Sequence, residues 1–267
     1  MDRKKLAYLT AGLMACLVSA AIILYLTSGK GERKRIFKRS ELAAVGHFIE
    51  SGEYSKTIPM LRKLREAWPD EAEIFYASAL VNYKLYRFRP ALKMAEQALQ
   101  KEPGAPAAQA ILGAAHYHLS NFDNAMDASR KAMRSDPKLA LPYHIIGAVY
   151  LRMGNTDEGI KLLKESIRLE PDNGMFWSKM SSAYLKRKDL NKSLEASQKA
   201  LKLDPALAGA HFNMGMAFFH SGDADAAVKH LQKAEDLFIE KRDKGWIARA
   251  RHTRNLIVSK RRNKTDK

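Results

Sequence analysis

Two histidines, His116 and His118, have one residue between them and are the first candidates for metal chemistry in this sequence. Imidazole nitrogens are common metal ligands, and two of them on one face can share an ion. On a helix, residues two apart point to different faces, so this pair does not predict a shared metal. The single cysteine, Cys16, excludes an intramolecular disulfide and a cysteine-based zinc cluster.

Sequence motifs for catalysis are also absent. The 267 residues contain no GxxxxGK[ST] phosphate loop, no GxSxG nucleophile turn and no HExxH metal motif. The acidic residues spread along the chain, and several of them stand directly before a proline. We therefore expect no enzymatic activity, no metal and no cofactor, and we expect the chemistry of this chain to be that of binding.

A sequence repeat predicts the secondary-structure elements that would position a binding surface. Five prolines recur every 34 residues. The segments IRLEP and LKLDP, which end at two of them, have nearly the same sequence. These prolines are Pro69, Pro103, Pro137, Pro171 and Pro205. An interval of this length is typical of proteins built from stacked repeats.

Small residues recur in phase with the prolines. Twenty-four residues before them come Val45, Ala79, Gly113, Gly147 and Ser181. Twelve residues before them come Thr57, Ala91, Ala125, Gly159 and Ser193. Small side chains allow two helices to cross closely, and turn signals such as SNFD and MGNT separate the two sets. Each unit is thus predicted to be a helical hairpin that ends before its proline.

The period and the order of residue sizes strongly resemble those of the tetratricopeptide repeat (TPR) family, most closely over residues 141–171 and 176–205. The resemblance implies an all-α fold in which stacked helical hairpins form a right-handed superhelix. It covers residues 38–241 as six repeats, with boundaries near 71, 105, 139, 173 and 207. We expect residues 242–258 to form a capping helix, with Trp246, Ala250, Leu256 and Ile257 covering the last hairpin. Residues 259–267 are expected to be a basic, disordered tail.

In the TPR family, the first helices of the repeats line a concave groove that binds peptides or partner helices. The matching positions are Tyr76, Leu80, Tyr83, Lys84, Tyr117, His118, His144, Leu151, Arg152, Ser178, Ser182, Leu185, Lys186, Phe212, Met216, Phe219 and His220. One TPR subgroup holds the C-terminal carboxylate of chaperones with Lys and Asn residues, and that set is absent here. The aromatic and aliphatic character of the groove instead favours an apolar peptide or an amphipathic helix.

Five of the groove positions are basic and recur at the same interval as the prolines: Lys84, His118, Arg152, Lys186 and His220. They would form a basic ladder along one edge of the groove for acidic side chains of a ligand. The alternative is that these side chains are simply solvated, since lysine is an ordinary TPR residue at this position.

The net charge of +17 lies at the two ends of the chain rather than in the repeats. The chain has 46 basic and 29 acidic residues, but residues 40–240 contain only 26 basic and 25 acidic ones. The excess of basic residues therefore lies in segments 1–5, 28–39 and 241–267. A nearly neutral repeat region disfavours a continuous nucleic-acid track, whereas basic ends favour contact with anionic lipid. Nucleic-acid binding through the basic C-terminal tail is the alternative of a different class.

Residues 6–27 form an apolar run without a charge. As a helix this run would be roughly 33 Å long, enough to cross a bilayer core. We therefore expect a five-residue tail at 1–5, a single transmembrane helix at 6–27 and a basic juxtamembrane linker at 28–37. A cleaved signal peptide and a lipoprotein signal with Cys16 as the lipidated residue are the alternatives.

The orientation and the pairing of this segment follow from its flanks and its small residues. The excess of basic residues after the run favours a repeat domain on the cytoplasmic side, although a basic N-terminus kept inside is the usual opposite case. Ala7, Ala11, Ala15 and Ser19 form a row at a spacing of four, which would let two copies pair into a homo-oligomer.

Together these features predict a membrane-anchored TPR scaffold that binds and recruits or assembles partner proteins through its groove. A related alternative is an import or assembly receptor of an organelle outer membrane, because such receptors share this layout.

Overall fold

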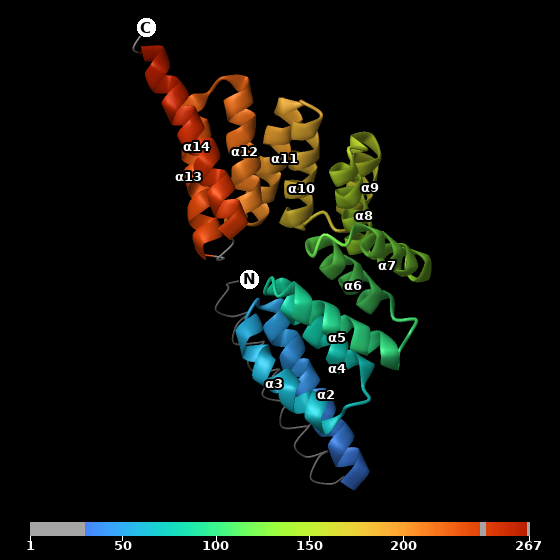
Figure 1. Ribbon diagram of the computed structural model, residues 1–267. Helices are drawn as coiled ribbons and strands as arrows, with labels where there is room; N and C mark the ends of the chain where they lie inside the picture. Colours follow the sequence, from blue (N-terminus) through green and yellow to red (C-terminus); the bar gives the residue numbers. More distant parts are fainter. Residues whose placement is uncertain (1–29, 241–243, 266–267) are drawn as a thin grey trace, which may run out of the picture. The chain divides into compact units, whose positions relative to one another are not determined.

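The computed structural model describes residues 30–240 and 244–265, which form 13 α-helices and no β-strand (Figure 1). The expected transmembrane helix at 6–27 lies outside the described residues, as does its row of small residues. Among the helices that are described, none is both long enough and apolar enough to cross a bilayer. The chain divides into two compact units, with the division between Gly104 and Ala105.

Unit 1 contains two helical hairpins in its described part. Its helices are α2 (Lys30–Glu50), α3 (Tyr54–Ala67), α4 (Ala72–Lys84) and α5 (Phe88–Lys101). Helix α2 packs against α3, and α4 packs against α5. Buried side chains of α2, α3 and α4, including Val45, Leu61 and Ile74, form the core of this unit. Because α2 begins at Lys30, most of the stretch expected to be a linker is helical.

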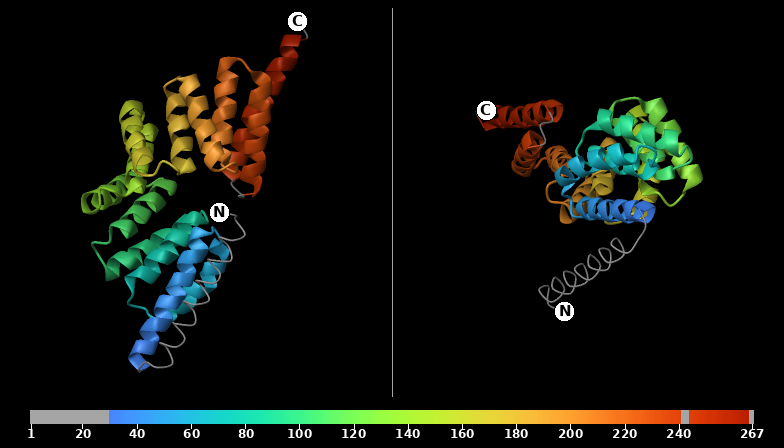
Figure 2. Two further views of the ribbon diagram at one scale, coloured as in Figure 1. Left: turned by 180° about the vertical axis from the view of Figure 1, so that it is seen from behind. Right: turned by 90° about the horizontal axis from the view of Figure 1, so that it is seen from below.

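Unit 2 contains four hairpins and a final helix. Its helices are α6 (Pro106–His118), α7 (Phe122–Ser135), α8 (Ala140–Met153), α9 (Thr156–Leu169), α10 (Gly174–Lys186), α11 (Leu190–Leu203), α12 (Ala208–Ser221), α13 (Ala224–Glu240) and α14 (Lys244–Thr265). The two helices of each hairpin lie side by side in Figure 1 and in the reverse view of Figure 2. Helix α14 continues to Thr265, so residues 259–265 are helical rather than the disordered tail that the composition suggested.

The turn inside every hairpin has the same backbone geometry. One or two residues after the end of the first helix, a residue has a positive φ in all six hairpins, between 58° and 94°. These residues are Gly52, Tyr86, Ser120, Gly154, Lys188 and Gly222. In each turn the following amide closes a bond to the carbonyl five residues earlier, as Asn155 does to Tyr150 at 2.9 Å. This is the Schellman arrangement, which ends a helix and reverses the chain.

The prolines end the second helix of each of the first five hairpins. Helices α3, α5, α7, α9 and α11 each end two residues before one of the spaced prolines. A proline disfavours helical backbone in the residue before it, which explains where these helices stop. At Asp136 and Asp204 the side chain also accepts a bond from the amide two residues later, at 2.9 and 2.8 Å, and so fixes the turn.

The phased small residues lie where the two helices of a hairpin cross. A Cβ atom on Gly147 would lie 3.0 Å from the Gly159 carbonyl oxygen, and one on Gly113 would lie 2.4 Å from the Ser129 hydroxyl. In the α10–α11 hairpin, serines take this place, and Ser181 hydrogen-bonds Ser193 at 2.9 Å. The small residues are therefore required by close backbone approach, as their spacing predicted.

Helix α14 covers the end of unit 2. Trp246 stacks on Phe238, with ring centroids 5.4 Å apart, and Ala250 and Ile257 are buried in the same cluster. Leu256, expected in this contact, is instead 43% exposed. The prediction of a capping contact thus holds for three of the four side chains named.

Candidate protein-binding face

The first helices of unit 2 bring together three side chains from three different hairpins. Lys179 on α10 donates from Nζ to the Oη atom of Tyr117 on α6 at 3.2 Å, and its Nζ atom lies 5.4 Å from the centroid of the Tyr117 ring. Arg152 on α8 also acts on the Tyr117 phenol and helps to lower its pKa. We call Tyr117, Arg152 and Lys179 the cationic cluster, because it combines one phenol with two positive charges.

The electrostatics of the cationic cluster favour a negative charge. Burial raises the pKa of the Tyr117 phenol, but the charges and hydrogen bonds of Lys179 and Arg152 outweigh burial and lower the pKa below its ordinary value. Within the described ranges, no carboxylate forms an ion pair with Arg152 or Lys179. The cluster therefore has excess positive charge that an acidic group could offset.

His144 on α8 is a neighbouring side chain in the interior of unit 2. Its ring is 4% exposed and stacks on Phe176 with a centroid distance of 4.7 Å. Its Nδ1 atom has no hydrogen-bond partner. Burial, aided by the charge of Lys179, holds the pKa of His144 well below its ordinary value, so the ring is neutral. His144 therefore belongs to the packed core rather than to an accessible groove.

The predicted groove residues fall into three classes of exposure. The exposed ones are Lys84, His118, Arg152, Lys186 and His220. The half-buried ones are Tyr76, Leu80, Ser178, Ser182, Leu185, Met216 and Phe219. Tyr83, Tyr117, His144, Leu151 and Phe212 are buried. All five positions of the expected basic ladder are thus exposed, whereas the large side chains are half-buried or buried.

Three predicted contacts have other roles in the structure. Leu151 is 3% exposed and packs with Ile160 and Leu163 in the interior of unit 2. Lys186 donates to the Leu151 carbonyl at 2.6 Å and so satisfies the C-terminal end of α8. Phe212 lies under the capping helix, with its ring centroid 5.3 Å from that of Trp246. All three residues thus make contacts within the fold, two through buried side chains and Lys186 through its ammonium group.

Lys179 is the residue of the cationic cluster that the groove prediction did not include. The repeat places it in register with Ala77, Ile111, Ile145 and Asn213, three of which are apolar. A charge at a position that is apolar in three of the other four repeats was the signal that could have identified it. Asn213, the other polar residue in this register, donates to the Ser178 carbonyl at 2.8 Å and joins α12 to α10.

The basic residues of the capping helix make contacts within unit 2. Arg251 donates from Nε to the Oε1 atom of Glu235 at 2.6 Å, and Arg254 lies 3.4 Å from Oε2 of the same carboxylate, which is almost fully buried. Arg249 lies over the Trp246 ring at 5.0 Å, and Lys260 over the Phe219 ring at 5.8 Å. These contacts hold α14 in place, and they engage side chains that the charge pattern had suggested for lipid.

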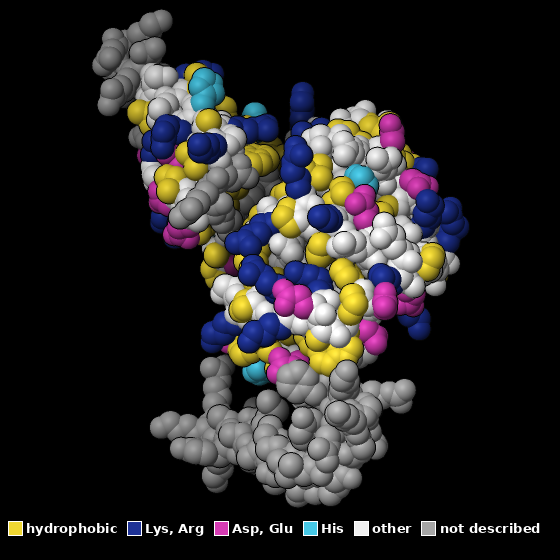
Figure 3. Space-filling view, turned by 60° about the horizontal axis from the view of Figure 1, so that its bottom comes forward, with side chains coloured by type: hydrophobic (Ala, Val, Ile, Leu, Met, Phe, Trp, Pro, Cys, Tyr) yellow, Lys and Arg dark blue, Asp and Glu magenta, His cyan; other side chains and the backbone are white. Residues whose placement is uncertain are grey.

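The face drawn in Figure 3 has mixed charge. On it, Lys and Arg side chains lie among acidic and hydrophobic ones. No group of three or more His, Cys, Asp or Glu residues that could hold a metal occurs in the described part of the chain.

Known protein families and structures match this architecture. A family described as "Anaphase-promoting complex, cyclosome, subunit 3" matches residues 84–166, one described as "TPR repeat" matches 181–222, and "Tetratricopeptide repeat" matches 208–238. The fold is thus that of a repeat protein built from helical hairpins. Residues 181–238 match tetratricopeptide-repeat models, in agreement with the resemblance seen in the sequence. No curated protein matches it by sequence.

Solved structures agree on the fold. A chain of the APC/C heterotetramer Cut9–Hcn1 matches with a TM-score of 0.64 and 18% identity over 80% of this chain and 45% of its own. The TPR protein TTC0263 of Thermus thermophilus matches with a TM-score of 0.58 and 21% identity, over 68% of this chain and 99% of its own. Yeast Tom70 matches at 0.57 and 16%, over 76% of this chain and 43% of its own. This chain therefore spans less than half the length of the Cut9–Hcn1 chain and of Tom70.

Proposed function

We propose that this protein is a scaffold that binds partner proteins through one face of unit 2, formed by the first helices of its hairpins, α6, α8, α10 and α12. We call it the first-helix face. The cationic cluster on it would be the contact for an acidic side chain of the partner. The observation that carries the proposal is the placement of Lys179 and Arg152 on the Tyr117 phenol without an ion-pair partner in the described residues. A carboxylate would gain charge-assisted hydrogen bonds from both cations. The tetratricopeptide repeats support the general role, because such repeats bind proteins.

The partner segment should combine acidic and apolar side chains. Near the cationic cluster, α10 presents Ser178, Ser182 and Leu185, which are half-buried and so offer polar and aliphatic contact area. An amphipathic helix or a short apolar peptide with one carboxylate in register with Lys179 fits this surface best.

A crosslinking experiment tests this proposal. A photoreactive amino acid at Ser182, on the binding face, should capture a partner in cells, whereas one at Lys164, an exposed position on the second helix α9, should not. Capture at Ser182 should fall when Lys179→Gln is added and should persist with Lys161→Gln, an equal charge change on α9. Capture that is the same in both variants would refute a role for the cationic cluster.

Membrane anchorage completes the proposed function. The apolar run at 6–27 would hold the scaffold at a membrane, with the repeats on the cytoplasmic side and the basic ends near anionic lipid. The small-residue row in that run would favour pairing of two copies. The protein should stay in the membrane fraction after carbonate washing, and protease added to intact cells should not reach the repeats. A shorter, soluble product would overturn the anchor, and digestion from outside would overturn the orientation.

A further inference from the structure

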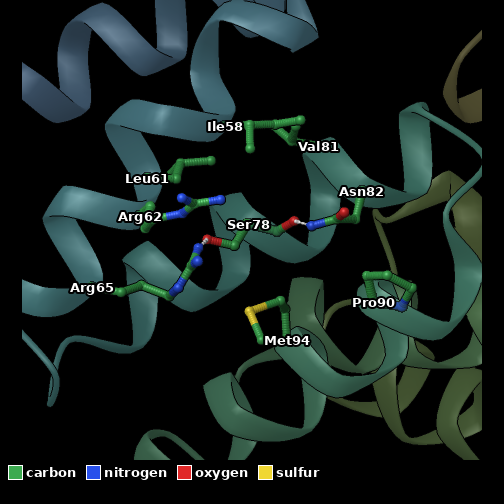
Figure 4. A pocket seen from close by; sticks show the side chains of 9 residues that line it. All are labelled: Ile58, Leu61, Arg62, Arg65, Ser78, Val81, Asn82, Pro90 and Met94. Carbon is green, nitrogen blue, oxygen red and sulfur yellow. Dashed lines mark hydrogen bonds between the residues drawn. The ribbon is translucent and has the colours of Figure 1, made fainter.

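Unit 1 contains a pocket that is separate from the first-helix face of unit 2. It has a volume of about 210 Å³ and lies between α3, α4 and α5 (Figure 4). Four polar side chains line it: Arg62, Arg65, Ser78 and Asn82. Two of the three helices are second helices of their hairpins, so the pocket does not belong to the predicted groove.

The hydrogen bonds inside the pocket show which polar atoms are already used. The Ser78 hydroxyl donates to the Ile74 carbonyl at 2.8 Å and accepts from Nη1 of Arg65 at 2.7 Å. Asn82 donates from Nδ2 to the Ser78 carbonyl at 2.7 Å (Figure 4). With its amide nitrogen engaged, Asn82 offers its Oδ1 atom as an acceptor. The pocket can therefore receive one N–H group from a ligand.

The charge in the pocket is positive, and the Glu66 carboxylate on α3 offsets it only in part. The guanidinium groups of Arg62 and Arg65 both point toward Ser78 in Figure 4. Burial, and then the charge of Arg62, lower the pKa of Arg65. Across the residues that the structure describes, neither arginine forms an ion pair with a carboxylate. Two like charges at one opening are best offset by a planar anion that each guanidinium can bind through two N–H groups.

The rest of the lining is apolar. Leu61 and Val81 are almost fully buried, and Met94 closes the side opposite α3 in Figure 4. A cavity of about 150 Å³ lined by aliphatic side chains is enough to hold benzene. The pocket therefore has room for one aliphatic side chain beside the anion.

We propose that this pocket binds the C-terminal residue of a partner peptide that ends in an aliphatic amino acid. Such a residue carries a carboxylate, a backbone N–H and an apolar side chain within a few ångströms. The carboxylate binds Arg62 and Arg65, the N–H donates to Asn82 Oδ1, and the side chain fills the space beside Leu61, Val81 and Met94. The apolar half of the lining favours this ligand over a phosphate, which has no group to place there.

The test uses the full chain in nonionic detergent and a fluorescein-labelled peptide of sequence Gly-Ser-Gly-Ser-Leu with a free C-terminal carboxylate, followed by fluorescence anisotropy. Arg62→Gln should weaken binding about 10-fold to 100-fold, the effect of losing a hydrogen bond between charged groups. The control is Lys63→Gln, an equal charge change at the next exposed position of α3, outside the pocket lining. It should leave binding unchanged.

A second variant and three further ligands test whether the bound anion is a C-terminal carboxylate, a Glu side chain or a phosphate. Met94→Glu would place a carboxylate in the pocket, so it should abolish peptide binding without lowering the melting temperature. The same peptide as a C-terminal amide, an amidated peptide with an internal Glu-Leu pair, and inorganic phosphate should each bind at least about 10-fold more weakly. Equal binding of any of these would overturn the C-terminal assignment. Failure of the free-acid peptide to bind below about 1 mM, or equal binding to Arg62→Gln, would overturn the site itself.

Discussion

His144 illustrates how one buried side chain makes the stability of unit 2 depend on pH. Its ring is neutral in the folded protein, and its folded pKa is lowered well below the ordinary value of 6.5. A group whose pKa is lowered on folding stabilises the fold fully above its unfolded pKa and loses that contribution as pH falls. The cost is at most about 1.4 kcal/mol per pH unit for one proton.

We predict that acidification from neutral pH to below 6.5 lowers the melting temperature, and that His144→Phe reduces this loss. Phenylalanine already occupies the same repeat position at Phe212, so the substitution suits the fold. Some acid sensitivity should persist because burial also lowers the pKa of His211 and of His230. Melting curves at several pH values measure the effect, and an unchanged pH dependence in the variant would contradict it.

For single residues, the sequence predicted which side chains lie on the first helices better than it predicted what each side chain contacts. The repeat identified Arg152 and Tyr117, and both lie in the cationic cluster. The repeat could not show that Phe212 is buried, because its burial depends on contact with Trp246, which lies on a helix outside the repeats. Nor did it predict that Lys186 binds a backbone carbonyl, since a long side chain can reach several partners.

At the scale of the elements, the hairpin turn is the most uniform feature. A positive φ favours glycine, yet three of the six turns have Tyr86, Ser120 or Lys188 at that position. Side chains in this region cost of order 1 kcal/mol or more because the Cβ atom crowds the following carbonyl. The SNFD signal predicted the turn at Ser120, whereas no turn signal marked those at Tyr86 and Lys188, where the two packed helices impose a geometry that the residue itself does not prefer.

Lys188→Gly should therefore stabilise the protein by about 0.5–1 kcal/mol, whereas Gly154→Ala should destabilise it by about 1 kcal/mol. The two sites have the same turn geometry, with φ of 62° and 89°, and make matched partners. Urea unfolding gives both free energies. A loss of stability in Lys188→Gly would show that this turn carries no backbone strain.

Two glycine substitutions, one where helices cross and one where they do not, test the close packing of the hairpins. Gly147→Ala should destabilise by about 1–3 kcal/mol, since the new Cβ would meet the Gly159 carbonyl oxygen at 3.0 Å. Gly46→Ala in α2 has nothing within 4 Å and should stabilise by up to about 1 kcal/mol through helix propensity. Thermal unfolding of the two variants decides the point. A neutral Gly147→Ala would mean that the hairpin relaxes more easily than its packing indicates.

At the scale of the whole molecule, the constant interval between the prolines predicted the helical hairpins and their close crossings. The division into two units after Gly104 and the continuation of α14 to Thr265 were not predictable from it. Both depend on contacts between repeats or beyond them, such as the buried Glu235 that holds Arg251. A charge count cannot distinguish such an internal arginine from one that is free for lipid.

The capping helix should determine the stability of the end of unit 2. Trp246→Ala removes the ring that packs on both Phe212 and Phe238, so we predict a loss of about 3–5 kcal/mol. Leu256→Ala, at an exposed position of the same helix, should change stability by less than about 0.5 kcal/mol. Urea unfolding measures both losses. Equal effects would refute the capping contact.

The measurement that most directly tests the central claim is the affinity of the partner captured at Ser182 for the wild-type chain and for Lys179→Gln, Arg152→Gln and Lys164→Gln, over a range of salt concentrations. If the cationic cluster binds an acidic group of the partner, the first two variants should each lose about 1–3 kcal/mol of binding free energy and depend less on salt. Lys164→Gln should bind like the wild type. Affinity that is the same in all four proteins, with the same salt dependence, would contradict the claim that this face of unit 2 is the protein-binding site.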